Sequence, residues 1–90
     1  MIYLSVCHTV ADYAKWRTVF DAHDAAQRAA GATGVPQVYR DQENPNAITV
    51  IIEWESVEKA QQFFRDPALA EAMKTAGVTS APEVHFMNRA

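Results

Sequence analysis

Apolar and polar residues alternate along the first ten positions, which is the spacing of a β-strand. From Ile2 to Val10 every second side chain shares one face, and this face holds Ile2, Leu4, Val6, His8 and Val10. A stronger strand is predicted from Ala47 to Glu55, where five β-branched residues follow one another. Two further strands are predicted from Val35 to Asp41 and from Glu83 to Asn88.

Helical spacing replaces alternation between the first and second strands. Asp12 is the predicted N-cap of one long helix. Its inward stripe recurs every three or four positions and consists of Tyr13, Trp16, Phe20, His23, Gln27 and Ala30. Gly31 and Gly34 follow the stripe and are predicted to end this helix before the second strand begins.

A second helical section is predicted after the strand from Ala47 to Glu55. Ser56 is its predicted N-cap. The pair Asp66-Pro67 restarts it, because Asp66 can cap a helix and proline is favoured at a first helical position. Gly77 is expected to close this section. The turn at 42–46 joins the second and third strands as a hairpin.

The element order β-α-β-β-α-β predicts a single α+β domain over residues 1–90. With right-handed crossovers this is the ferredoxin-like arrangement, a four-stranded antiparallel sheet with two helices on one face. The helix-facing side of the sheet is predicted to carry Leu4, Val6, Val50, Ile52, Trp54, Val84 and Phe86. The reverse side is predicted to carry Tyr3, Ser5, Cys7, Thr49, Ile51, Glu53, His85 and Met87.

The composition of the reverse side predicts a partner. It is too apolar for bare solvent and too polar for a dry core. A chain of 90 residues also buries a small core, and its lone cysteine excludes an internal disulfide. We therefore expect a homodimer formed sheet to sheet, in which a second copy covers this face.

The charge balance argues against several other partners. Eight Lys and Arg residues oppose eleven Asp and Glu residues, which gives a net charge of −3. The basic residues are scattered, so we expect no nucleic-acid binding. The longest apolar run is far shorter than a membrane span, and the N-terminal residues lack the features of a signal peptide. The sequence therefore predicts a cytoplasmic protein without a membrane partner.

The segment Glu53-Trp54-Glu55-Ser56 supports a family resemblance. Together with the Asp66-Pro67 restart and the closing run at 82–87, it resembles the antibiotic-biosynthesis-monooxygenase (ABM-like) branch of the dimeric α/β-barrel superfamily. The resemblance covers nearly the whole chain. It implies a homodimer paired as a dimeric α/β barrel. It also implies one of the activities of the family, whose members include cofactor-independent monooxygenases and cyclases acting on aromatic polyketides, and haem-degrading oxygenases.

Few functional residues of these enzymes carry over to this chain. The quinone-forming monooxygenases of the family pair a Trp at the position of Trp54 with an Asn at the position of Val50. Their helix Tyr aligns with Ala60, and their Arg with a position near Ala70. The axial His of the haem-degrading members falls on Met73. The resemblance therefore implies a site without a cofactor. Haem degradation ranks third, after a cofactor-independent enzyme and a homodimer without catalysis.

Histidines remain as candidate acid–base groups, because their unperturbed pKa lies near neutrality. His8 lies on the apolar face of the first predicted strand, and His23 lies on the inward stripe of the first predicted helix. Both can border one pocket between helix and sheet as general base or acid, or both can be buried structural residues. The candidate walls of this pocket, for a hydrophobic substrate, are Trp54, Phe64, Trp16 and Met73.

Two other constellations are weaker. Cys7 and His85 can face each other across neighbouring strands as a nucleophile and base, with Glu53 orienting the histidine. The three histidines have no metal-ligand spacing, so we expect no metal site. We predict a cofactor-independent enzyme of the monooxygenase or cyclase/isomerase type for an aromatic or polyketide-like molecule. The alternative is a ligand-binding or accessory homodimer without catalysis.

Overall fold

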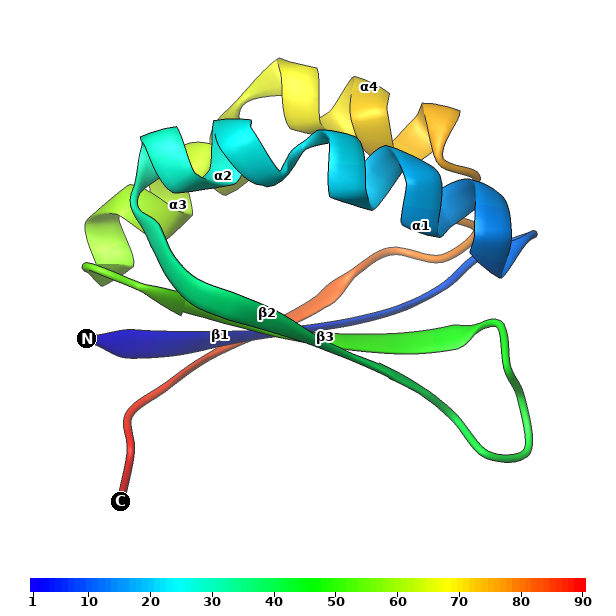
Figure 1. Cartoon of the computed structure of the whole chain (residues 1–90), viewed down its shortest axis with the longest axis horizontal. Helices are drawn as coiled ribbons and strands as arrows, with labels where there is room; N and C mark the ends of the chain where they lie inside the picture. Colours follow the sequence, from blue (N-terminus) through cyan, green and yellow to red (C-terminus); the bar gives the residue numbers. More distant parts are fainter.

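The computed structural model describes residues 1–90 and has the predicted order of elements, with each helical section divided in two. The elements are β1 (Ile2–Thr9), α1 (Tyr13–Ala22), α2 (Asp24–Ala30), β2 (Ala32–Arg40), β3 (Ala47–Trp54), α3 (Val57–Arg65), α4 (Pro67–Thr75) and β4 (Glu83–Met87). All helices lie over one face of the sheet, and the other face is bare (Figure 1). The predicted ferredoxin-like α+β fold is confirmed.

The four strands form one antiparallel sheet in the order β2-β3-β1-β4. The central pair, β1 and β3, is in register with Leu4 opposite Ile52 and Val6 opposite Val50. On the other side of β1, Leu4 lies opposite Phe86 in β4. Alternation along these strands therefore directs one set of apolar side chains toward the helices, as predicted.

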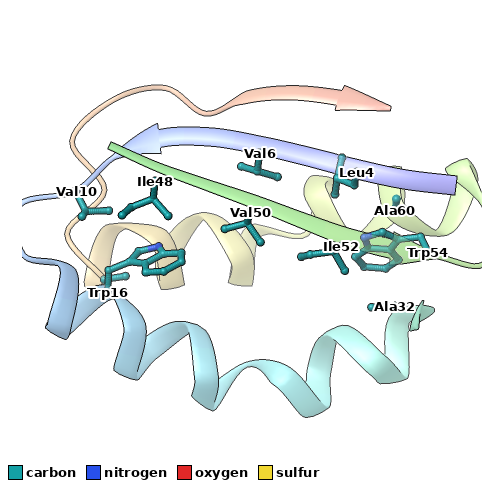
Figure 2. Packing of buried hydrophobic residues seen from close by; sticks show 11 residues of the cluster. Leu4, Val6, Val10, Trp16, Ala32, Ile48, Val50, Ile52, Trp54 and Ala60 are labelled. Atoms are coloured by element: carbon teal, nitrogen blue, oxygen red, sulfur yellow. The ribbon is translucent and has the colours of Figure 1, made fainter. Parts of the chain in front are cut away.

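The core lies between the sheet and the helices (Figure 2). Leu4, Ile48, Val50 and Trp54 are fully buried. Trp16 is the buried residue of α1, and Ala60 is the buried residue of α3. Because 15 of the 90 residues are buried, the core is small, as the chain length predicts.

The predicted helix caps are confirmed, but the single long first helix is not. The Asp12 carboxylate accepts hydrogen bonds from the backbone N–H groups of Ala14 and Lys15. Ser56 caps α3 and Asp66 caps α4, with Pro67 at the first helical position. The first helical section instead breaks at His23, which ends α1 and precedes α2.

The second predicted strand begins earlier than expected. Gly31 ends α2 with φ of 123°, whereas Gly34 lies inside β2, which starts at Ala32. The pairing of β2 with β3 shifts register between Thr33 and Gln37, and Gly34 sits in this irregular stretch with φ of 69°. Gly34 is therefore a strand irregularity and not a helix end, because a positive φ suits a bulge as well as a cap.

Two predictions about the faces need correction or qualification. Phe86 lies on the helix-facing side but is 40% exposed, because β4 is an edge strand with a neighbour on one side only. The bare face carries half-buried Tyr3, Cys7 and Ile51, while His85 and Met87 are exposed.

None of the helices has the length and apolar character that crossing a bilayer requires.

Candidate functional site

A cavity lies between the helices and the sheet. It is partly open to solvent, and the space inside it that the centre of a water molecule can reach is about 70 Å³. Fifteen residues line it, and twelve of them are hydrophobic: Val6, Trp16, Val19, Phe20, Val50, Ile52, Phe63, Phe64, Leu69, Ala72, Met73 and Ala76. Such an apolar cavity with a few polar groups is the usual form of a small-molecule site.

The three remaining lining residues are polar and come from different elements. His8 lies in β1, His23 lies at the junction of α1 and α2, and Gln27 lies in α2. No carboxylate, lysine or arginine lines the cavity. The two histidines are therefore its only side chains that can exchange a proton near neutral pH.

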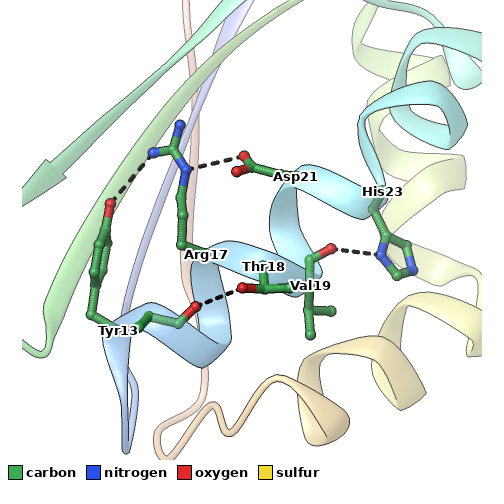
Figure 3. A network of polar contacts seen from close by, with 7 residues as sticks. Tyr13, Arg17, Thr18, Val19, Asp21 and His23 are labelled. Carbon is green, nitrogen blue, oxygen red and sulfur yellow. Dashed lines mark hydrogen bonds and ion pairs between the residues drawn. The ribbon is translucent and has the colours of Figure 1, made fainter.

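His23 has a defined hydrogen bond that fixes its tautomer (Figure 3). Its Nδ1 lies 2.9 Å from the backbone carbonyl oxygen of Val19. A carbonyl oxygen can only accept, so Nδ1 carries the proton in the neutral ring. The lone pair of Nε2 is then free to accept a proton or a hydrogen bond from a ligand.

The break between α1 and α2 produces this arrangement. His23 lies outside both helices, with φ of −93° and ψ of 4°, and its backbone N–H bonds to Phe20. The flanking carboxylates are paired on the exposed surface, Asp21 with Arg17 and Asp24 with Arg28. Neither contacts the imidazole, so Val19 alone orients the ring by a hydrogen bond.

His8 is more deeply buried and has no polar partner. It is 7% exposed, and neither ring nitrogen makes a hydrogen bond within the chain. Burial lowers the pKa of His8, because the charged form loses its hydration. His8 is therefore neutral at physiological pH, with one N–H donor and one nitrogen acceptor left unpaired.

Gln27 completes the polar set and was not among the predicted site residues. It is 6% exposed, and its side chain makes no hydrogen bond within the chain. Its signal in the sequence is a polar residue on an otherwise apolar stripe, four positions after His23.

Aromatic side chains form part of the cavity wall. The rings of Trp16 and Phe20 are stacked, with centroids 4.9 Å apart and planes inclined by 19°. On α3, the rings of Phe63 and Phe64 meet edge to face, with centroids 6.0 Å apart. These flat surfaces are suited to a planar apolar ligand.

The structure brings most of the predicted site residues together. His8, His23, Trp16, Phe64 and Met73 all line the cavity. Trp54 does not. It is fully buried against Phe63, with ring centroids 5.4 Å apart, and its indole Nε1 has no hydrogen-bond partner. The structure therefore does not place Trp54 in the lining of this cavity, because the end of β3 lies under α3 in the core.

The positions that the resemblance compares with known enzymes are apolar. Val50 lines the cavity where an Asn was expected by analogy, and Ala60 is fully buried. Ala70 is exposed on α4. The polar groups of this cavity thus lie at other places than those of the quinone-forming enzymes.

The predicted arrangement of Cys7, His85 and Glu53 is not formed. Cys7 lies opposite Glu83, and His85 lies opposite Ser5, so the register is offset by two residues from the one expected. His85 bonds to Glu83, and Glu53 accepts a hydrogen bond from Thr33. The Cys7 thiol lies 3.5 Å from the hydroxyl of Thr49 instead.

The structure has no group of three or more metal-ligating side chains close enough to hold an ion.

A second hollow lies at the end of the sheet, and its lining is more polar than that of the first cavity. His8 borders it together with Cys7, Thr9, Arg40 and Thr49. His8 therefore lies between this hollow and the apolar cavity.

No protein-family model matches the chain, and no curated protein matches its sequence. Solved structures match its fold. A proposed antibiotic biosynthesis monooxygenase from Bordetella bronchiseptica has a TM-score of 0.84 at 20% identity, over 99% of this chain and 96% of the other.

Two further solved structures match the fold at lower similarity. SnoaB, a cofactor-independent oxygenase from Streptomyces nogalater, has a TM-score of 0.70 at 19% identity, over 99% of this chain and 94% of its own. The monooxygenase ActVA-Orf6 of Streptomyces coelicolor, in complex with nanaomycin D, has a TM-score of 0.65 at 18% identity, over 99% and 87%. The chain thus has an ABM-like fold.

Proposed function

We propose that this chain is a small enzyme of the cofactor-independent monooxygenase or cyclase/isomerase type. Its substrate is a hydrophobic aromatic or polyketide-like molecule bound in the cavity between helices and sheet. The observation that carries the proposal is the placement of His8, His23 and Gln27 as the only polar groups of an otherwise apolar cavity. The oxygenases that share the fold support it.

Proton removal is the step that this cavity is suited to perform. His23 holds its Nδ1 proton on the carbonyl of Val19, so Nε2 is oriented to accept a proton from an acidic O–H or C–H group. The O–H or C–H bond breaks, its electron pair stays on the substrate, and the proton moves to Nε2. His8, neutral and unpaired, can hydrogen-bond to a substrate atom in the same cavity.

The resulting anion can follow two routes without a cofactor. In the oxygenase route, a CH₂ group becomes C=O while O₂ supplies that oxygen and forms one water. The substrate loses four electrons and O₂ gains four, so no external reductant is needed. In the cyclase route, the carbanion attacks a carbonyl carbon of the same molecule, with no net oxidation.

Anthrone tests the oxygenase route, because its CH₂ group lies between two aromatic rings. We expect oxygen uptake and anthraquinone formation with the wild-type protein. Replacing the proposed base in His23→Gln should lower the rate by about 10²–10⁴-fold. Gln62→Leu is the control, because Gln62 is exposed on α3 and does not line the cavity. Equal rates for wild type and His23→Gln would remove His23 from the mechanism.

A ligand-binding homodimer without catalysis is the second candidate. The observation that favours it is the apolar character of Val50, Ala60 and Ala70, where the quinone-forming enzymes of the resemblance carry Asn, Tyr and Arg. This function predicts that aromatic ligands bind in the cavity, while neither oxygen uptake nor isomerisation exceeds the background rate.

We also propose that a second copy of the chain covers the bare sheet face. This face carries the half-buried Tyr3 and Ile51 and the exposed Tyr39, which is 54% accessible. Burying such apolar area stabilises a dimer by roughly 25 cal/mol per Å². Ile51→Lys should convert the dimer to a monomer in sedimentation analysis, whereas Ala29→Lys, on the exposed side of α2, should not. Sedimentation of the wild type as a monomer would contradict this.

A further inference from the structure

Gln27 is a polar residue in a place where an apolar one would be expected. It is 94% buried, it lines the cavity, and its side-chain amide makes no hydrogen bond within the chain. The amide atoms are not among the fully buried, unpaired polar atoms of the chain, which are His8 Nδ1, His8 Nε2 and Trp54 Nε1, so the amide keeps some accessible surface. Because Gln27 lines the cavity, this amide is free to bond to a molecule that enters it.

Its position relative to His23 defines what that partner is. Gln27 follows His23 by one helical turn, and its backbone N–H bonds to the His23 carbonyl at 3.0 Å. Both residues line the cavity, where Gln27 offers an amide N–H donor and His23 offers the acceptor Nε2.

The charged groups near this pair do not duplicate its role. His8 is the other titratable group of the cavity, and it comes from the sheet side. Asp21 and Asp24 are held by Arg17 and Arg28 on the exposed surface. No cationic side chain lines the cavity, so the side-chain N–H groups that can face a ligand anion there are those of Gln27 and the imidazoles.

We infer that the Gln27 amide donates a hydrogen bond to the ligand oxygen on which negative charge develops when His23 accepts a proton. In this step the ligand O–H bond breaks, the proton moves to Nε2 of His23, and the electron pair stays on the oxygen. A preorganised donor stabilises such an anion strongly in a site of low dielectric. This inference rests on the proposed function, because it places the ligand in the same cavity.

The ionisation of a bound phenol tests this role directly. 4-Nitrophenol is a suitable probe, because its anion absorbs visible light and the neutral form does not. The measured quantity is the ionisation constant of the bound probe, compared between the wild type and its variants. In Gln27→Leu the ionisation constant of the bound probe should fall about tenfold or more, since hydrogen bonds to charged groups are the stronger ones. Gln27→Glu, which replaces the donor with a negative charge, should lower it at least as much.

Two controls separate this effect from altered packing. 4-Nitroanisole has the same ring but cannot ionise, so Gln27→Leu should leave its affinity within about twofold. Gln62→Leu, on the exposed side of α3, should leave the ionisation of bound 4-nitrophenol unchanged. Binding of both probes is followed by quenching of the fluorescence of Trp16, which lines the cavity.

The outcomes distinguish this inference from the proposed function. If Gln27→Leu binds the probe and ionises it as the wild type does, the role of Gln27 is wrong, whatever the turnover of anthrone. If the ionisation constant falls as expected but no substrate is turned over, the donor role stands and the catalytic function fails. If neither probe binds the wild type, both proposals fail together.

Discussion

The imidazole of His8 lies against the indole of Trp16, with ring centroids 5.6 Å apart and planes inclined by 59°. Trp16 is 4% exposed and comes from α1, whereas His8 belongs to the central strand β1. The indole thus covers a polar ring that has no hydrogen-bond partner of its own. This pair joins the helix layer to the sheet at the cavity and keeps His8 out of bulk water.

An unpaired imidazole at this position lowers the stability of the folded chain. We expect His8→Leu to raise the free energy of unfolding by about 1–3 kcal/mol, because the substitution removes two unpaired buried nitrogens and keeps a similar volume. Urea denaturation followed by circular dichroism measures the change. A loss of stability would contradict this expectation and would mean that the packing of the imidazole stabilises the folded chain more than its unpaired nitrogens destabilise it.

The same residue should make stability depend on pH. Burial lowers the pKa of His8 below the ordinary value of 6.5. Below that value the unfolded chain binds more protons than the folded chain, so stability is lost as the pH falls. The urea midpoint of the wild type should therefore fall as the pH is lowered through 6.5. It should fall by more than the urea midpoint of His8→Leu falls over the same pH range.

The two tryptophans should respond differently to substitution. Trp54 is fully buried in the core, so Trp54→Ala should cost about 3–5 kcal/mol of unfolding free energy. Trp16 lines the cavity, whereas Trp54 lies behind Phe63, so quenching by 4-nitroanisole should be weaker in Trp16→Phe than in Trp54→Phe. Equal quenching in the two variants would place the bound ligand elsewhere.

Gly31 and Gly34 both have positive φ but differ in their surroundings. A Cβ atom at Gly31 would lie 2.7 Å from Cδ of Lys59, whereas a Cβ at Gly34 would meet nothing within 4 Å. Backbone strain of about 1–2 kcal/mol applies to alanine at either position. Thermal unfolding should therefore show a larger loss for Gly31→Ala than for Gly34→Ala. Equal losses would mean that the Lys59 side chain moves aside freely.

The sequence pattern predicted the strands and the cavity histidines because both follow from periodicity. Alternation placed Leu4, Val6 and His8 on one face, and helical spacing placed His23 on the inward stripe. The position of Trp54 could not be obtained in this way. A tryptophan at the end of a strand has the same pattern whether it lines a cavity or lies beneath a helix.

Register was the second feature beyond the reach of a single sequence. Cys7 and His85 share a face of the sheet, but a two-residue offset between β1 and β4 places Glu83 opposite the thiol. Turn composition does not define this offset, because β1 and β4 are distant in the chain. Helical spacing placed Gln27 on the inward stripe, but spacing alone does not show that its side chain borders a cavity.

The cavity and the bare face lie on opposite sides of the same sheet. Ligand atoms in the cavity contact one side of β1 and β3, while a second copy would contact the other. One hydrogen-bonded antiparallel sheet separates the two sides. We therefore expect the two cavities of a dimer to fill independently, with a hyperbolic binding curve and an affinity that does not depend on protein concentration.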